Sequence, residues 1–168
     1  MNISKTVTLT IICIISFITI LLVIQLLLRK LKLKSEKEGP LNFSYAVWFV
    51  TLFIAATIAM VRTIAILNEA IDNLYKNIST NIIVEVVKTS SLFLGLTALW
   101  FIVWYYVSNF LSVTILGTRK DQNEIEANNV SYFLIKGVLI IGFILCLLPV
   151  FEIILRIFMP NVQMPFYH

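Results

Sequence analysis

Few residues in this chain of 168 are of the types that catalyse reactions or bind metals. The single histidine is His168, and the two cysteines, Cys13 and Cys146, both lie inside apolar runs. A zinc site needs about four Cys, His or carboxylate ligands, and an enzyme needs a nucleophile, a base or a metal held in a pocket. We therefore expect no catalytic residue, no metal site and no cofactor, and we expect the thiols to behave as small apolar side chains.

Charged residues within apolar runs are better candidates, because a charge inside a bilayer is usually functional or paired. They are Arg62, Lys136, Glu152 and Arg156. Lys136 stands early in the last apolar run, so its amine can either reach the nearer interface by snorkelling or serve an ion pathway. We expect Arg62 and Glu152 to pair across the second and fourth helices. Glu152 and Arg156 are four residues apart and can pair along one helix.

The composition identifies the solvent that surrounds these charges. The chain is 60% hydrophobic and only 13% charged, whereas soluble domains are about half apolar and a quarter charged. Four runs each reach the length of about 20 residues that a membrane span needs. We therefore predict an all-α membrane protein, a single domain of residues 1–168 with four transmembrane helices in two hairpins. The lipid bilayer is its main partner, and nothing in the sequence indicates nucleic-acid binding.

The first apolar run, residues 7–28, has the position of a secretory signal peptide. It is longer than the apolar region of such a peptide, and no small-residue cleavage site precedes the charges that follow it. We therefore expect this run to be retained as a transmembrane helix.

Two similar stretches, Asn42-Phe-Ser-Tyr45 and Asn129-Val-Ser-Tyr132, each follow a charged segment and open an apolar run. They indicate a duplicated hairpin, with repeat 1 at about 7–68 and repeat 2 at about 89–158. Each asparagine is of the type that caps a helix start. Two spans per repeat would leave both copies facing the same way, as parallel repeats. The residues of this motif are Asn42, Ser44, Tyr45, Asn129, Ser131 and Tyr132.

Basic residues favour one orientation in the membrane. Most of them lie in the segment after the first run and in the segment 117–129, which places both in the cytoplasm and both termini outside. We expect the connection of residues 29–40 to be rich in turns, and its cations could also contact anionic lipid headgroups. The outer segment 68–88 is either a helix in the interface or an extension of the third span. The candidate headgroup contacts are Arg29, Lys30, Lys32 and Lys34.

Small and aromatic residues within the spans predict packing surfaces. Small residues let helices approach closely in lipid, and mid-span tryptophans suggest a seam between helices, either inside the chain or towards a partner. Pro149 should kink the last span. The candidate packing residues are Ala55, Ala59, Trp100, Trp104, Gly137 and Gly142.

The stretch from Glu124 through Asn129-Val-Ser-Tyr132 to Gly142, with its weaker copy at 36–45, resembles the YjfL-like family of bacterial inner-membrane proteins. Members are small and have four spans in two duplicated hairpins of unknown function. The resemblance implies a location in the bacterial inner membrane and implies no particular activity.

Three functions remain to be compared. An enzyme is disfavoured, because the spans hold no histidine and no paired carboxylates. A subunit of an oligomeric ion channel or small-solute transporter is the alternative, with Lys136 as its best residue. The favoured prediction is a structural or assembly subunit that packs with itself or with other membrane proteins.

Overall fold

The computed structural model describes residues 3–35, 42–76 and 81–160. These residues form helices, with no strand among them, so the predicted all-α fold is confirmed. Four of the helices are long and apolar enough to cross a membrane. In chain order the elements are α1 (Ile3–Ser35), α2 (Phe43–Lys76), α3 (Ile82–Leu116), α4 (Asp121–Glu126) and α5 (Val130–Ile157).

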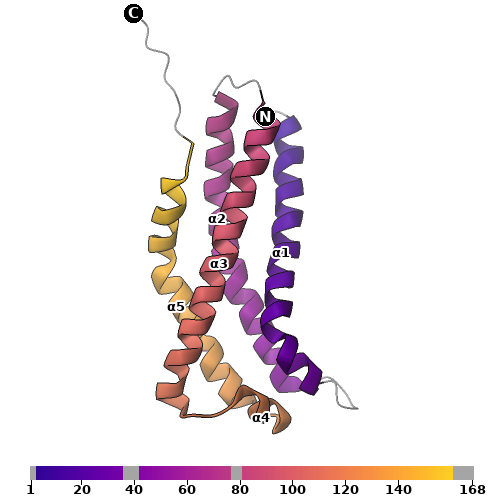
Figure 1. Cartoon of the computed structure of the whole chain (residues 1–168), viewed down its shortest axis with the longest axis vertical. Coiled ribbons are helices and arrows are strands. Elements are labelled where there is room, and N and C mark those ends of the chain that lie inside the picture. Colours follow the sequence, from indigo (N-terminus) through magenta and orange to yellow (C-terminus); the bar gives the residue numbers. More distant parts are fainter. Residues whose placement is uncertain (1–2, 36–41, 77–80, 161–168) are drawn as a thin grey trace, which may run out of the picture.

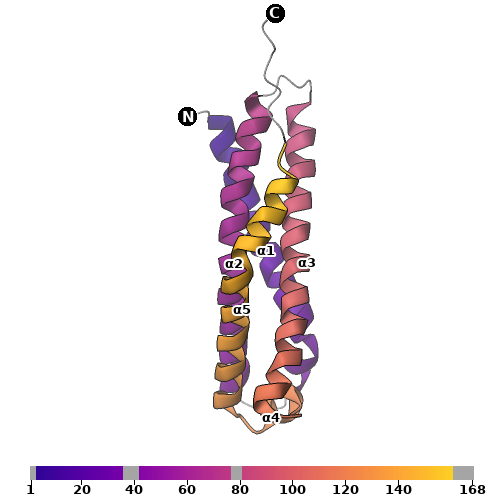
Figure 2. The same ribbon diagram turned by 90° about the vertical axis from the view of Figure 1, so that its left-hand side faces the viewer.

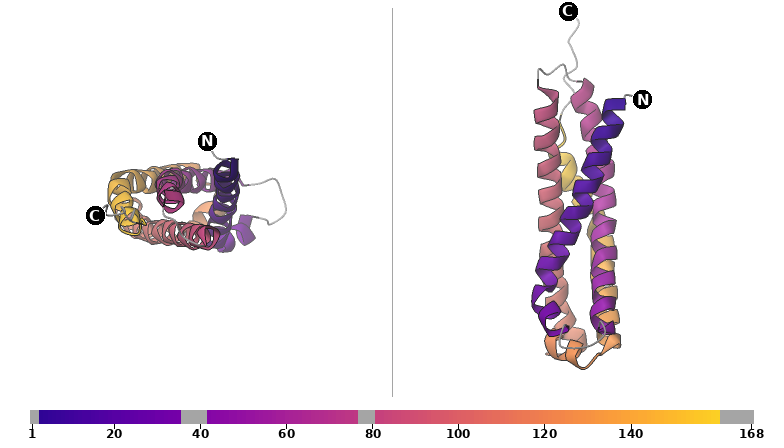
Figure 3. Two further views of the ribbon diagram at one scale, coloured as in Figure 1. Left: turned by 90° about the horizontal axis from the view of Figure 1, so that it is seen from above. Right: turned by 90° about the vertical axis from the view of Figure 1, so that its right-hand side faces the viewer.

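The four long helices form an elongated bundle in which consecutive long helices run in opposite directions (Figure 1). The short α4 lies across one end of this bundle, which we call the α4 end. Residues 3 and 160 lie at the opposite end, so the two described chain ends are on the same side, as four spans require. Seen from above, α1 and α5 occupy opposite sides, with α2 and α3 between them (Figure 3). The parallel helices α2 and α5 pack along one another (Figure 2).

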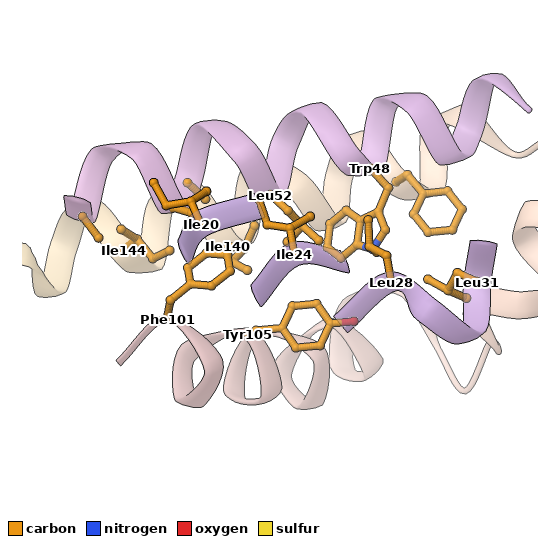
Figure 4. Packing of buried hydrophobic residues seen from close by; sticks show 14 of the residues in the cluster. Ile20, Ile24, Leu28, Leu31, Trp48, Leu52, Phe101, Tyr105, Ile140 and Ile144 are labelled. Carbon is orange, nitrogen blue, oxygen red and sulfur yellow. The ribbon is translucent and has the colours of Figure 1, made fainter. Parts of the chain in front are cut away.

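The interior is mainly apolar because each helix turns one apolar stripe inward, at spacings of three and four residues. Near the α4 end, Ile24, Trp48 and Ile140 converge from three different helices, and each side chain is fully buried (Figure 4). A second cluster around Leu67 and Phe93 fills the opposite end. The outward faces are also apolar, as lipid contact demands. More than half of the side chain is exposed at Leu22, Val50, Leu99 and Val138.

Three helices are longer than predicted, and two of them, α2 and α3, extend into the outer segment. The helix α2 continues to Lys76 and α3 begins at Ile82, so the outer segment 68–88 is mostly helix ends. Of the two alternatives for this segment, an extension of the third span is the correct one. The extension persists because Ile71 and Val86 are still buried against neighbouring helices. At 1.5 Å per residue the 35-residue α3 is about 52 Å long, which exceeds the roughly 30 Å of bilayer hydrocarbon.

The basic segment after the first span is helical through Ser35, so the expectation of a turn-rich connection there is wrong for residues 29–35. Leu28 and Leu31 are both buried and continue the inward stripe of α1. Cations near a helix C-terminus also interact favourably with the helix dipole. The connection at 36–41 lies outside the described residues.

The last span forms as predicted, from Val130 to Ile157, and stays one helix through Pro149. It changes direction along its length (Figure 1), as a missing backbone hydrogen bond at proline allows. The six-residue α4 was not expected, since its charged sequence reads as a solvated loop. The chain turns from α3 towards α4 at Gly117, which ends α3 with φ 77°. This backbone conformation favours glycine.

Candidate functional site

The most unusual side chain in the bundle is Lys136 of α5, which is 2% exposed. It lies on the inward stripe of α5, beside the fully buried Phe133. The amine reaches towards the nearer end of the bundle, as the snorkelling alternative expects, but it ends on a carboxylate and not in solvent. Its Nζ lies 2.6 and 2.7 Å from the two carboxylate oxygens of Asp121. Asp121 is the first residue of α4, so this short helix brings a counter-ion to the lysine.

Aromatic rings complete the surroundings of this ion pair. The Tyr132 hydroxyl donates a hydrogen bond of 2.8 Å to Asp121. The Lys136 amine lies 5.1 Å from the Trp48 ring centroid and 5.7 Å from that of Tyr132. A cation over an aromatic face is attracted by the electron density of the ring. The buried charge is thus compensated by one carboxylate and two rings.

Residues of the first Asn-x-Ser-Tyr stretch, at the start of α2, form hydrogen bonds to α4 and to the loop that follows it, and so hold α4 in place. Asn42 Nδ2 donates to the carbonyl oxygen of Ile125 in α4, at 2.6 Å. The Ser44 N–H and hydroxyl both donate to Asn128 Oδ1, at 3.1 and 3.0 Å. Asn42 Oδ1 also accepts from the Ser44 N–H at 3.0 Å, which caps the start of α2. Ile125 of α4 is fully buried in the apolar cluster at this end, which holds α4 against the bundle. The two stretches therefore lie side by side at the α4 end.

The second stretch has a related but different role. Asn129 Oδ1 accepts from the Tyr132 N–H at 3.3 Å and caps α5. Asn129 Nδ2 donates to Glu124 Oε2 at 2.6 Å, and Glu124 also lies 3.6 Å from an Arg119 nitrogen. Ser131 is exposed, whereas its counterpart Ser44 is buried. Tyr132 belongs to the ion cluster, whereas Tyr45 is only partly buried at the packing surface.

The other predicted intramembrane charges lie towards the opposite end. The expected pair forms between Arg62 Nε and Glu152 Oε1, at 3.6 Å. Arg156, however, pairs with Glu69 of α2, at 2.8 and 3.3 Å, rather than with Glu152. The parallel packing of α2 and α5 brings Glu69 beside Arg156, and this pair ties two helices together. A further pair, Lys5 with Asp72, links α1 to α2.

The predicted packing residues divide into three groups. Ala55 and Ala59 are fully buried between helices. Gly137 is also at a close approach, because an added Cβ would lie 2.9 Å from Thr51 Oγ1. Gly142 has open space where a Cβ would stand, so the predicted close approach is wrong there.

The two mid-span tryptophans form a seam between α3 and α5. Trp100 stacks on Phe151 with ring centroids 5.0 Å apart, and Trp104 stacks on Phe143 at 6.4 Å. Of the two alternatives for this cluster, contact inside the chain is the one that occurs. Among the basic residues predicted to contact lipid headgroups, Arg29 is exposed. The side chains of Lys30, Lys32 and Lys34 are outside the described part.

An open pocket of about 450 Å³ adjoins the ion cluster at the α4 end. It is lined by residues of α1, α3, α4 and α5, including Lys136 and Asp121. Within the described ranges, no group of three or more His, Cys, Asp or Glu residues could hold a metal ion. Cys13 and Cys146 are free and exposed on the outer faces.

Asp121 and α4 are the parts of this site that sequence reasoning missed. Two signals point to them. Lys136 falls on the apolar inward stripe of the last span, where a charge needs a partner. Ile125 is an isolated apolar residue in an otherwise polar loop, which suggests that the loop folds back onto the bundle.

The fold and its paired charges define an all-α protein with four helices able to cross a membrane, of the multi-pass class. Comparison of the chain with protein-family models, with curated proteins and with solved structures found no match.

Proposed function

We propose that this protein is a non-enzymatic structural or assembly subunit that packs with itself or with other membrane proteins. The observation that carries the proposal is that each predicted intramembrane charge has an opposite charge on another helix. Lys136 pairs with Asp121, Arg62 with Glu152, and Arg156 with Glu69 of α2. Charges that bind each other hold helices together and are not free to coordinate a transported ion.

The outer surface supports the same role. All four long helices turn large apolar side chains outward. Helix association in lipid depends on van der Waals packing, so such faces suit lipid and other membrane helices equally. A bundle with apolar sides and internally paired charges is therefore suited to scaffolding.

We further propose a location in the bacterial inner membrane, which the resemblance to the YjfL-like family supports. The α4 end would face the cytoplasm and the described chain ends the outside, since Arg29, Arg119 and Lys120 gather near the α4 end. Two parallel repeats of one hairpin are part of this proposal. The pair Glu69–Arg156 supports it, because these residues are 87 positions apart, as are the two Asn-x-Ser-Tyr stretches.

The orientation predicts a labelling pattern. In a variant without Cys13 and Cys146, a single cysteine replacing Lys76 should react with a membrane-impermeant maleimide added to intact spheroplasts. A cysteine replacing Lys120 should react only after the membrane is opened. The reverse pattern would overturn the proposed orientation.

Photo-crosslinking in the native membrane tests the scaffold role. A photoreactive residue placed at an exposed position of each long helix, Leu22, Val50, Leu99 or Val138, samples every outward face. We expect at least one of these positions to give a discrete protein–protein adduct. The fully buried Phe133 serves as the control and should give none. If all four positions crosslink only to lipid, and the purified protein is monomeric in mild detergent, the scaffold role is wrong.

The channel or transporter subunit remains the second candidate, favoured by the polar pocket beside Lys136. It predicts ion or solute flux into liposomes that hold the purified protein. Flux that is lost in a Lys136→Met variant that still folds would replace the scaffold role with this one.

A further inference from the structure

We propose that the pocket at the α4 end binds the phosphate group of an anionic phosphate ester. This inference is independent of the scaffold role, because it concerns a ligand and not a partner protein. The pocket has a volume of about 450 Å³ and is open to the outside. The residues that carry the argument are Arg119, Lys120, Lys136, Asp121, Asn109 and Val113, all of which line it.

The charge of the pocket favours an anion. Three cationic side chains and one carboxylate line it, which leaves two net positive charges. The carboxylate of Asp121 is already engaged by Lys136 and Tyr132, so it presents little free negative charge to a ligand. Lys136 is 2% exposed and directs its amine at Asp121, so it contributes charge to the wall of the pocket and not a free donor.

The other two cations that line the pocket, Arg119 and Lys120, are exposed. Lys120 is exposed and forms no ion pair among the described residues. Arg119 is 58% exposed and lies 3.6 Å from Glu124, a loose pair that a phosphate could replace. Arginine presents a planar fork of donors and lysine a compact charge, and both are common phosphate ligands.

Asn109 adds a neutral polar side chain to the wall of the pocket. Its carboxamide interacts with the side chain of Tyr105, and a carboxamide has enough donors and acceptors to bond also to a hydroxyl group of the ligand, such as that of a glycerol headgroup.

The place of the pocket in the bundle suits a lipid headgroup. It opens at the end of the long helices, where the headgroups of a bilayer lie. Val113 lines the pocket and is 43% exposed, and Phe110, one turn away on α3, is 77% exposed. An acyl chain could lie along these two side chains while its phosphate occupies the pocket. A soluble phosphate ester would use the same cations without the apolar contact.

The test compares three probes with the purified full-length protein in a neutral detergent. Short-chain phosphatidylglycerol, glycerol phosphate and short-chain phosphatidylcholine are titrated, and binding is measured by native mass spectrometry and isothermal calorimetry. Binding of phosphatidylglycerol above phosphatidylcholine identifies a lipid headgroup as the ligand. Equal binding of glycerol phosphate identifies a soluble ester. Failure of both phosphatidylglycerol and glycerol phosphate to bind overturns the proposal.

Variants locate the binding. Lys120→Gln should weaken binding about tenfold, the size of one lost charge-assisted hydrogen bond, and Lys120→Arg should restore it. The matched control is Lys76→Gln, which removes one exposed charge at the opposite end of the bundle. If Lys120→Gln and Lys76→Gln weaken binding equally, the attraction is general surface charge and the pocket is not the site. All three substitutions are at exposed or helix-end positions, so folding can be verified by circular dichroism.

Discussion

Removing the carboxylate of Asp121 should destabilise the whole bundle, because it leaves Lys136 buried without a counter-ion. The Asp121 side chain makes three hydrogen bonds of 2.6–2.8 Å, two to Lys136 and one to Tyr132. The loss of one member of a buried ion pair costs about 3–5 kcal/mol. Asp121 is 23% exposed, so some water reaches the pair and we expect Asp121→Ala to lower the unfolding free energy by about 3 kcal/mol.

A second substitution separates loss of the pair from loss of packing. In the double variant Asp121→Ala with Lys136→Met, no charge remains buried, and replacement of a buried pair by apolar groups is often close to neutral. The double variant should therefore be more stable than Asp121→Ala alone by about 2 kcal/mol.

The measurement is reversible unfolding in mixed micelles of mild detergent and dodecyl sulfate, followed by far-ultraviolet circular dichroism. Asp72→Ala is the matched control, because it removes a carboxylate that is 42% exposed and paired with Lys5. Exposed pairs contribute about 0–1 kcal/mol. If the double variant and Asp121→Ala unfold at the same dodecyl sulfate fraction, the buried charge is not the source of the instability and the reasoning is wrong.

Two further pairs of variants test the packing at the two glycines of α5 and the hydrogen bond of Ser44 at the α4 end. Gly137→Ala should destabilise by about 1–3 kcal/mol, because its Cβ would crowd Thr51. Gly142→Ala should be neutral or stabilise by up to about 1 kcal/mol, through helix propensity alone; equal effects of the two on thermal unfolding would contradict the packing. Ser44→Ala should cost about 1 kcal/mol, since it removes one hydrogen bond to the loop before α5. Ser131 is the exposed counterpart, and Ser131→Ala should leave the free energy of unfolding unchanged. An equal loss of stability in the two serine variants would show that the hydrogen bond between Ser44 and Asn128 contributes no stability.

The sequence predicted the structure best where residues that are close together along the chain determine it. The helix start at Asn129 follows from its capping side chain, and the end of α3 at Leu116 follows from the glycine after it. The pair between Arg62 and Glu152 could be expected, since both stand near the outer end of their spans. In these cases the controlling residues are close in sequence, or a bilayer fixes their depth.

The remaining features depend on contacts that local patterns do not encode. Lys136 and Asp121 are 15 residues apart, and their meeting depends on α4 folding back over the start of α5. The two glycines of α5 differ for a similar reason. Gly137 falls on the same stripe as Phe133 and Ile140, which are fully buried, whereas Gly142 lies off that stripe. Which stripe faces inward is decided by how the neighbouring helices pack.

The closeness of Lys136 and Asp121 along the chain has a consequence for biogenesis. A lone lysine within a span opposes insertion through the translocon, by about 2.5–3.5 kcal/mol at the centre of the helix and by less nearer its end, where Lys136 lies. Here the neutralising carboxylate belongs to the same hairpin as the lysine, so α3, α4 and α5 can be inserted as a unit whose charge is already compensated. The contacts of Asn42 and Ser44 with the α4 loop can form afterwards, at the membrane surface. At this end of the bundle, the first hairpin can thus join the second through hydrogen bonds that form at the membrane surface.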